Sequence, residues 1–115
     1  MKTIIHVDNS GFFRKHMQAF LEKEGFEVGS YDSAREASIA ISGGIDMVIT
    51  GLAFADIDGE EFLKRAVESY AGPIIVVTGS VDEEGEKYIL SLGARAVIGK
   101  SGWKDALIPH LSALK

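Results

Sequence analysis

Short apolar runs rich in β-branched residues alternate with longer amphipathic segments along the whole chain, and this alternation restricts the possible folds most. Each apolar run has the length of a β-strand, and each segment between two runs can hold a helix that crosses over a sheet. Such alternation is typical of βαβ units, in which parallel strands are covered by helices on both faces. We therefore predict an α/β fold with an open, doubly wound parallel sheet. The five predicted strands span residues 3–7, 26–30, 45–50, 73–78 and 96–98.

Helix signals occur in the segments between the predicted strands. Ser33 followed by Glu36 forms a capping-box pattern, and Asp58 followed by Glu61 predicts a similar start for the third helix. Pro109 falls inside the last helical segment, so we expect it to kink that helix or to delay its start. The residues predicted to face the core are Phe13, Met17, Phe20, Leu21, Phe62, Leu63, Ala66, Ile89, Leu92, Trp103, Leu107, Leu111 and Leu114.

The length and charge of the chain narrow the class of protein. A chain of 115 residues fits one domain, which we expect to span 1–115, and 46% hydrophobic residues suffice for a core. The net charge of -5 is spread along the chain and leaves no basic stripe that could neutralise nucleic-acid phosphates. We therefore expect no nucleic-acid partner.

The N-terminal segment and the apolar runs bear on localisation. Asp8 follows the first apolar run too early for the apolar region of a signal peptide to develop. The apolar runs are also too short for a membrane-spanning helix. With no cysteine in the chain, these features predict a cytoplasmic protein without membrane contact.

Polar residues follow the predicted strands at their carboxyl ends. In an open parallel sheet these ends meet along one edge, where ligands bind. Asp8 and Asn9 follow the first strand, and Gly51 follows the third. Thr78 ends the fourth strand, and Lys100 follows the fifth. We expect these five residues to form one pocket.

The chain resembles the response-regulator receiver family over essentially its whole length, and chemotaxis-type single-domain regulators in particular. The resemblance implies a flavodoxin-like, three-layer fold with five helices and a sheet in the strand order 2-1-3-4-5. It also implies a role in two-component phosphorelay signalling, so we do not expect the chain to be an enzyme. The motifs that carry the resemblance are Val-Asp-Asn-Ser at 7–10, Asp-Gly at 58–59, Val-Thr-Gly at 77–79, Gly-Ala at 93–94 and Lys100.

The phosphorylation site of the family is altered in this chain. In the family, two acids after the first strand and an aspartate after the third hold magnesium, and that aspartate accepts the phosphoryl group. The acceptor lies seven residues before the aspartate that matches Asp58, so its equivalent is Gly51, which has no nucleophile. Asn9 replaces the second acid. Only Asp8 and the backbone carbonyl of Ala53 remain as metal ligands, so we expect weak or absent magnesium binding and no other cofactor.

Three further departures fall around the same pocket. Val97 stands where the family has its switch aromatic on the fifth strand. Ser101 and Ala55 stand where the family usually has prolines. Together with Asn9 and Gly51 they make five departures at one site, which indicates that the constraint of phosphorylation chemistry has been released.

The remaining polar residues of the predicted pocket are given structural roles. We expect Asp8 to face Lys100 in a pocket whose charges roughly compensate, so that no metal is needed to relax it. Thr78, which contacts phosphoryl oxygens in the family, is expected to be structural here, and Ser10 is expected to cap the first helix. No metal or phosphorelay site is assigned to the three histidines, which are His6, His16 and His110.

Three functions are compatible with these observations. The leading hypothesis is an interaction module that acts without phosphorylation, with contacts on the last helices and strand and with a histidine kinase or output protein as partner. The second keeps phosphotransfer and moves it to a displaced carboxylate, namely Asp8, Asp56 or Asp58. The third is a small-molecule binder that uses the crevice over Gly51.

Overall fold

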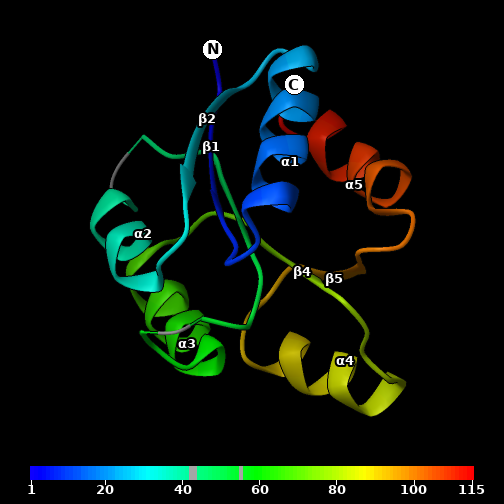
Figure 1. Cartoon of the computed structure of the whole chain (residues 1–115). Helices are drawn as coiled ribbons and strands as arrows, with labels where there is room; N and C mark the ends of the chain where they lie inside the picture. Colours follow the sequence, from blue (N-terminus) through cyan, green and yellow to red (C-terminus); the bar gives the residue numbers. More distant parts are fainter. Residues whose placement is uncertain (42–43, 55) are drawn as a thin grey trace.

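Five parallel strands form one sheet in the order β2-β1-β3-β4-β5 in the computed structural model (Figure 1), which describes residues 1–41, 44–54 and 56–115. This order and the doubly wound α/β architecture confirm the predicted fold. Each predicted strand is present with its ends within two residues of the prediction. The strands are β1 Thr3–Val7, β2 Glu27–Tyr31, β3 Met47–Thr50, β4 Ile74–Thr78 and β5 Ala96–Gly99.

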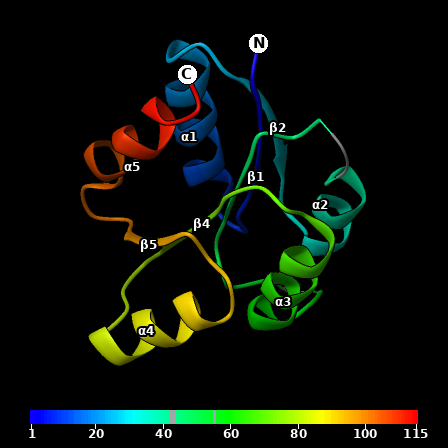
Figure 2. The same ribbon diagram turned by 180° about the vertical axis from the view of Figure 1, so that it is seen from behind.

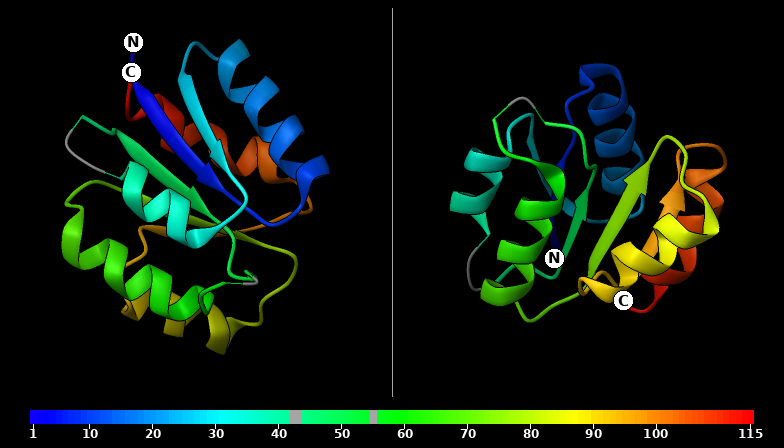
Figure 3. Two further views of the ribbon diagram at one scale, coloured as in Figure 1. Left: turned by 60° about the vertical axis from the view of Figure 1, so that its left-hand side comes forward. Right: turned by 90° about the horizontal axis from the view of Figure 1, so that it is seen from below.

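Helices cover both faces of the sheet and complete the three layers (Figures 2 and 3). Residues of α1 and α5 pack on one face with Ile4, Ile49 and Val77. Residues of α3 and α4 pack on the other face with Ile5, and α2 adjoins them. The helices are α1 Gly11–Lys23, α2 Ala34–Ala40, α3 Gly59–Ser69, α4 Glu83–Ser91 and α5 Trp103–Ser112.

Three helices start where the sequence signals predict, and the side-chain cap hydrogen bond forms in two of them. Ser10 accepts a hydrogen bond from the amide of Phe13, and Ser33 accepts one from the amide of Glu36, as predicted. Asp58 occupies the N-cap position of α3 but makes no side-chain cap hydrogen bond, so that part of the prediction is wrong. Glu61, the other residue of the predicted capping box, forms an ion pair with Arg65 one turn later, with 3.1 Å between Oε1 of Glu61 and Nε of Arg65.

Pro109 was expected either to kink α5 or to delay its start, and the start is not delayed. The helix begins at Trp103 and continues through Pro109 to Ser112. Trp103 anchors this start because its ring packs edge-on against Phe13 and Phe20, with centroids 5.3 and 5.2 Å apart. Because a proline lacks only its own N–H, a single hydrogen bond to the preceding turn is lost.

The helices differ in how firmly they are held. The described part of α4 has one buried residue, Ile89, whereas α1 and α3 bury three and four residues respectively. Since helix stability in proteins comes mainly from packing of an apolar face, α4 is the most weakly anchored of these three. None of the described helices combines the length and the apolar character that a membrane crossing requires.

Candidate functional site

The predicted site residues come together at the carboxyl edge of the sheet. Asp8, Asn9, Gly51, Thr78 and Lys100 all line one crevice of about 60 Å³. They reach it from the ends of β1, β3, β4 and β5, as the parallel arrangement requires. The other residues that line the crevice are Leu52, Ala53, Val77 and Gly79.

Asp8 is the centre of the polar contacts in this crevice. Its side chain is only 3% exposed, and its Oδ2 lies 3.2 Å from the Nζ of Lys100. The same ammonium lies 3.4 Å from Oδ1, which also accepts a hydrogen bond of 2.8 Å from the amide of Ser10. The predicted pairing of Asp8 with Lys100 is therefore confirmed, and both carboxylate oxygens have partners inside the protein.

Two residues that were not assigned to the site from the sequence, Arg14 and the core residue Phe13, contact this ion pair. Arg14 donates from Nη1 to the backbone carbonyl of Asp8 at 2.6 Å. The ammonium of Lys100 lies 4.4 Å from the centroid of the Phe13 ring, within range of a cation–π interaction. The sequence feature that could have indicated both contacts is the position of Phe13 and Arg14 in the first turn of α1, three and four residues after the cap at Ser10.

Gly51 leaves room that the Asp8 carboxylate now occupies. A Cβ atom added to Gly51 would lie 2.8 Å from Oδ2 of Asp8, which is closer than real contacts of this kind. The backbone of Gly51 is tied to the sheet by a hydrogen bond of 2.9 Å from its amide to the carbonyl of Val7. Any side chain at 51 would therefore have to push the Asp8 carboxylate away from this position.

His6 lies in β1 two residues before Asp8 and is fully buried. Neither ring nitrogen has a hydrogen-bond partner among the described residues, and the ring packs edge-on against Phe13 at 5.7 Å. Burial lowers the pKa of His6 from 6.5 to about 4; the negative charge of Asp8 opposes this shift, and the positive charges of Arg14 and Lys100 add to it. The imidazole is therefore neutral at neutral pH, and this agrees with its assignment to the core.

The crevice does not fit a magnesium ion as its side chains stand. Mg²⁺ requires near-octahedral oxygen ligands and is usually held by one or two carboxylates together with phosphate or water. Asp8 is the one carboxylate among the residues that line the crevice, and its oxygens already accept from Lys100 and Ser10. Across 1–41, 44–54 and 56–115, no cluster of three or more metal-ligating side chains occurs. Ala53 lines the crevice, but its carbonyl alone would not complete a shell.

The other residues singled out from the sequence make fewer contacts. Thr78 is partly buried at the end of β4, and Asn9 is exposed. Val97 is partly buried and packs in the core on the α3 and α4 face. Ser101 is exposed in the turn after β5, and Ala55 lies outside the described residues.

Of the three carboxylates considered as displaced acceptors, Asp56 and Asp58 lie outside the lining of the crevice. Asp56 binds the start of α2, where its oxygens accept from the amides of Ala34 at 3.3 Å and Arg35 at 2.9 Å. The hydrogen bond from Arg35 is the main reason why the pKa of Asp56 is lowered. Asp58 is exposed and lines a different groove, between α3 and α4.

The sequence model of the response regulator receiver domain matches residues 4–112. The chain belongs to this family. No curated protein matches the chain in sequence. Receiver domains are modules of two-component signalling, so the family gives the general function of the chain.

Solved structures of receiver domains share its fold. A CheY-like receiver domain protein from Methanospirillum hungatei is 26% identical, with 98% of this chain and 92% of that chain covered and a TM-score of 0.88. The chemotaxis protein CheY4 of Vibrio cholerae is 25% identical, with 100% and 99% covered and a TM-score of 0.84. The BeF3-activated receiver domain of Klebsiella pneumoniae RstA, at 21% identity, 99% coverage of both chains and a TM-score of 0.91, is similar in fold alone.

Proposed function

We propose that this receiver domain acts without phosphorylation, as a module that transmits a signal through contacts with another protein. The observation that carries the proposal is the arrangement at the phosphoacceptor position. Gly51 offers no nucleophile, and the carboxylate of Asp8 occupies the space where an acceptor side chain would begin. As for other members of the receiver family, the partner would be a histidine kinase or an output protein. The net charge of -5 without a basic stripe argues against nucleic acid.

Phosphorylation of a displaced carboxylate has little support in the geometry. In-line attack requires the attacking oxygen to be held about 3 to 3.5 Å from phosphorus, with the stabilising donors aligned. Asp8 is buried and its oxygens are bound to Lys100 and Ser10, so attack would first require this pairing to break. Asp56 is bound to the backbone of α2, and Asp58 faces another groove. We therefore place this function second.

The electrostatics of the crevice support a domain that does without a metal. A pocket with several carboxylates is strained by their repulsion until a cation binds. Here Asp8 has the ammonium of Lys100 at 3.2 Å, while Asn9 and Gly51 carry no charge. The protein thus supplies its own cation, and we expect no magnesium-dependent change of state.

A small-molecule function is limited by the size of the crevice over Gly51. Its volume of about 60 Å³ is far below the roughly 300 to 1,000 Å³ of ligand pockets. The space is suited to a few water molecules. This function therefore has no specific observation in its favour.

Intact-mass spectrometry after incubation with excess acetyl phosphate and Mg²⁺ tests the proposal directly. We expect no phosphoryl adduct on the natural chain. In parallel, amide NMR spectra recorded with Mg²⁺ and then with beryllium fluoride should show no saturable shifts at Asp8, Gly51, Thr78 or Lys100. A stoichiometric adduct, or saturable shifts at these four residues, would show a working acceptor and end the proposal.

A further inference from the structure

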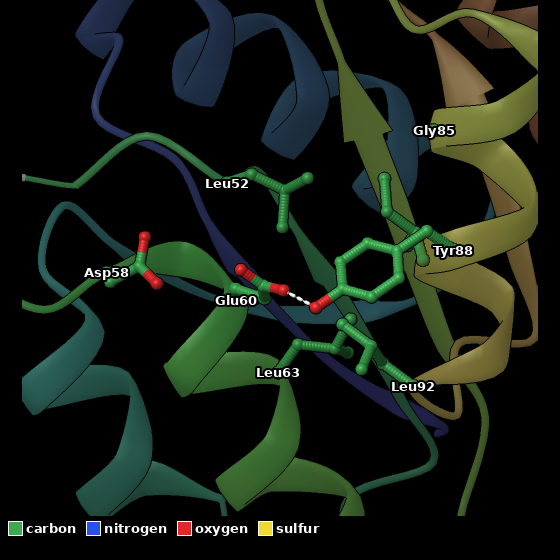
Figure 4. Close-up of a pocket in the computed structure, with 8 residues that line it drawn as sticks. Leu52, Asp58, Glu60, Leu63, Gly85, Tyr88 and Leu92 are labelled. Atoms are coloured by element: carbon green, nitrogen blue, oxygen red, sulfur yellow. Dashed lines mark hydrogen bonds between the residues drawn. The ribbon is translucent and has the colours of Figure 1, made fainter.

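A groove separates α3 from α4 on the face of the sheet opposite to α1 and α5 (Figure 4). Its volume is about 280 Å³, several times that of the crevice over Gly51. Ile89, the one buried residue among the described residues of α4, lies in the lining of the groove. The residues that line it are Leu52, Asp58, Glu60, Leu63, Gly85, Tyr88, Ile89 and Leu92.

The groove combines an apolar floor with a polar bridge at its rim. Leu63 and Ile89 are buried, and Leu52 and Leu92 are partly buried, so the floor is hydrocarbon. The hydroxyl of Tyr88 donates a hydrogen bond to the carboxylate of Glu60, and this contact spans from α4 to α3 (Figure 4). Tyr88 is nevertheless 50% exposed, so its ring is open to an incoming group.

The rim of the groove is acidic. Asp58 and Glu60 contribute two carboxylates, and no basic side chain lines the groove in the part of the chain that the structure describes. The cap and first turn of α4 carry further acids outside this lining, and Lys87, the basic residue of α4, is itself 4.0 Å from Glu83. The acids of the first turn and cap of α4 are Asp82, Glu83, Glu84 and Glu86.

We propose that this groove binds an arginine side chain presented by a protein partner. The methylene stem of an arginine would lie on the apolar floor, and its guanidinium would reach the rim. Long cationic side chains commonly bury their stem on apolar surface and keep the charged head in polar surroundings. The planar head can bind the carboxylate of Glu60 with two hydrogen bonds and stack on the ring of Tyr88. Asp58 would add a second negative charge to the lining of the groove.

The existing bridge between Tyr88 and Glu60 does not prevent this binding. The Tyr88 hydroxyl donates one hydrogen bond to Glu60, whereas a guanidinium carries a positive charge and can donate two parallel hydrogen bonds to the same carboxylate. A guanidinium can therefore replace the Tyr88 hydroxyl at the carboxylate and leave the aromatic ring free to stack. The inference rests on the proposed function in taking the partner to be a protein, and it assigns that partner a surface and a side chain.

The test uses the full chain and a synthetic seven-residue peptide with one arginine between two leucines, capped at both ends. Amide NMR titration should give saturable shifts at Leu52, Gly85 and Tyr88. A matched peptide with citrulline in place of arginine has the same shape without the charge, and we expect it to bind at least tenfold more weakly. Absence of binding by the arginine peptide at millimolar concentration, or equal binding by both peptides, would overturn the inference.

Variants of the chain separate the groove from a general attraction to an acidic protein. Glu60→Gln and Tyr88→Ala should each weaken binding of the arginine peptide about tenfold, whereas Tyr88→Phe keeps the ring and should bind with little change. Glu61→Gln is the matched control, since Glu61 lies on the same helical turn, is exposed and does not line the groove. If Glu61→Gln weakens binding as much as Glu60→Gln, the groove is not the site.

The two proposals fail in different measurements. A phosphoryl adduct in the mass spectrum would remove the phosphorylation-independent function and leave arginine binding in the groove intact. Failure of the arginine peptide to bind would remove the groove as a partner site and leave the silent phosphoacceptor position intact.

Discussion

Protonation of His6 should make the stability of this receiver domain depend on pH between about 6.5 and 4. The ring is fully buried in β1, and neither nitrogen has a hydrogen-bond partner among the described residues. Burial, with the positive charges of Arg14 and Lys100, outweighs the opposing negative charge of Asp8. The folded state therefore disfavours the imidazolium, whereas the unfolded chain accepts a proton near pH 6.5. Because the unfolded state binds the extra proton in this window, lowering the pH stabilises the unfolded chain relative to the folded one.

The size of the effect follows from the two pKa values. At about 1.4 kcal/mol for each pH unit between 6.5 and about 4, the free energy of unfolding should fall by about 3 kcal/mol. The contribution of His6 is absent above pH 6.5, grows as the pH falls and is complete below about pH 4. With urea slopes of about 1 to 3 kcal/mol/M, the unfolding midpoint should move by about 1 to 3 M.

Urea unfolding of the natural chain and of His6→Met, at several pH values from 7 to 4, measures this contribution. Methionine is apolar and similar in volume to histidine, so the variant should fold, and it cannot take up the proton. Other titrating groups affect both proteins equally, so the difference between them isolates His6. His16→Gln is the control, because His16 is exposed, and it should follow the natural chain. Parallel curves for the natural chain and His6→Met from pH 7 to pH 4 would refute the reasoning.

Three further predictions concern the crevice. Gly51→Asp should lower the free energy of unfolding by about 2 kcal/mol at neutral pH, because a second carboxylate displaces that of Asp8. In differential scanning fluorimetry, Mg²⁺ should raise the melting temperature of this variant and leave that of the natural chain unchanged. Lys100→Met should lower the free energy of unfolding in urea by about 2 kcal/mol, because it leaves a buried carboxylate unpaired. The double variant with Asp8→Asn should recover most of this loss. No recovery in the double variant would contradict the pairing. Arg14→Leu should lower the free energy of unfolding by about 1 kcal/mol in the same assay, because the hydrogen bond to the Asp8 carbonyl is lost. An unchanged urea midpoint would show that this contact is not stabilising.

The alternation of apolar runs and amphipathic segments was enough to predict the layers of the fold, because it reflects burial of strands on both faces of a sheet. Local signals were less reliable where tertiary contacts competed with them. At Glu61 the predicted cap gave way to an ion pair with Arg65, which is available one turn along the same helix. At Pro109 the packing of Trp103 fixed the start of α5 upstream of the proline.

The polar half of the site could be predicted because strand ends converge at one edge of a parallel sheet. Asp8 and Lys100 meet there as expected. The supporting contacts of Arg14 and Phe13 could not be derived in the same way, because they depend on how α1 is rotated over the sheet. The groove between α3 and α4 escaped prediction for a related reason, since it results from how far α4 stands from its neighbour.

The internal ion pair has a consequence for how this domain can transmit a signal. A pocket that is relaxed only by a cation and a phosphoryl group has two electrostatic states, and the free energy that separates them can drive a change elsewhere in the fold. Under the function proposed here, Lys100 neutralises Asp8 without a bound metal, and the crevice has one electrostatic state. A change of conformation would then be driven by differential binding of a partner to two arrangements of the protein. Among the helices whose packing is compared above, α4 requires the least free energy to move, because Ile89 is its one buried residue in the described chain. A partner that binds between α3 and α4 would act directly on that helix, which is why the peptide titration and the shifts of α4 residues are the decisive measurement.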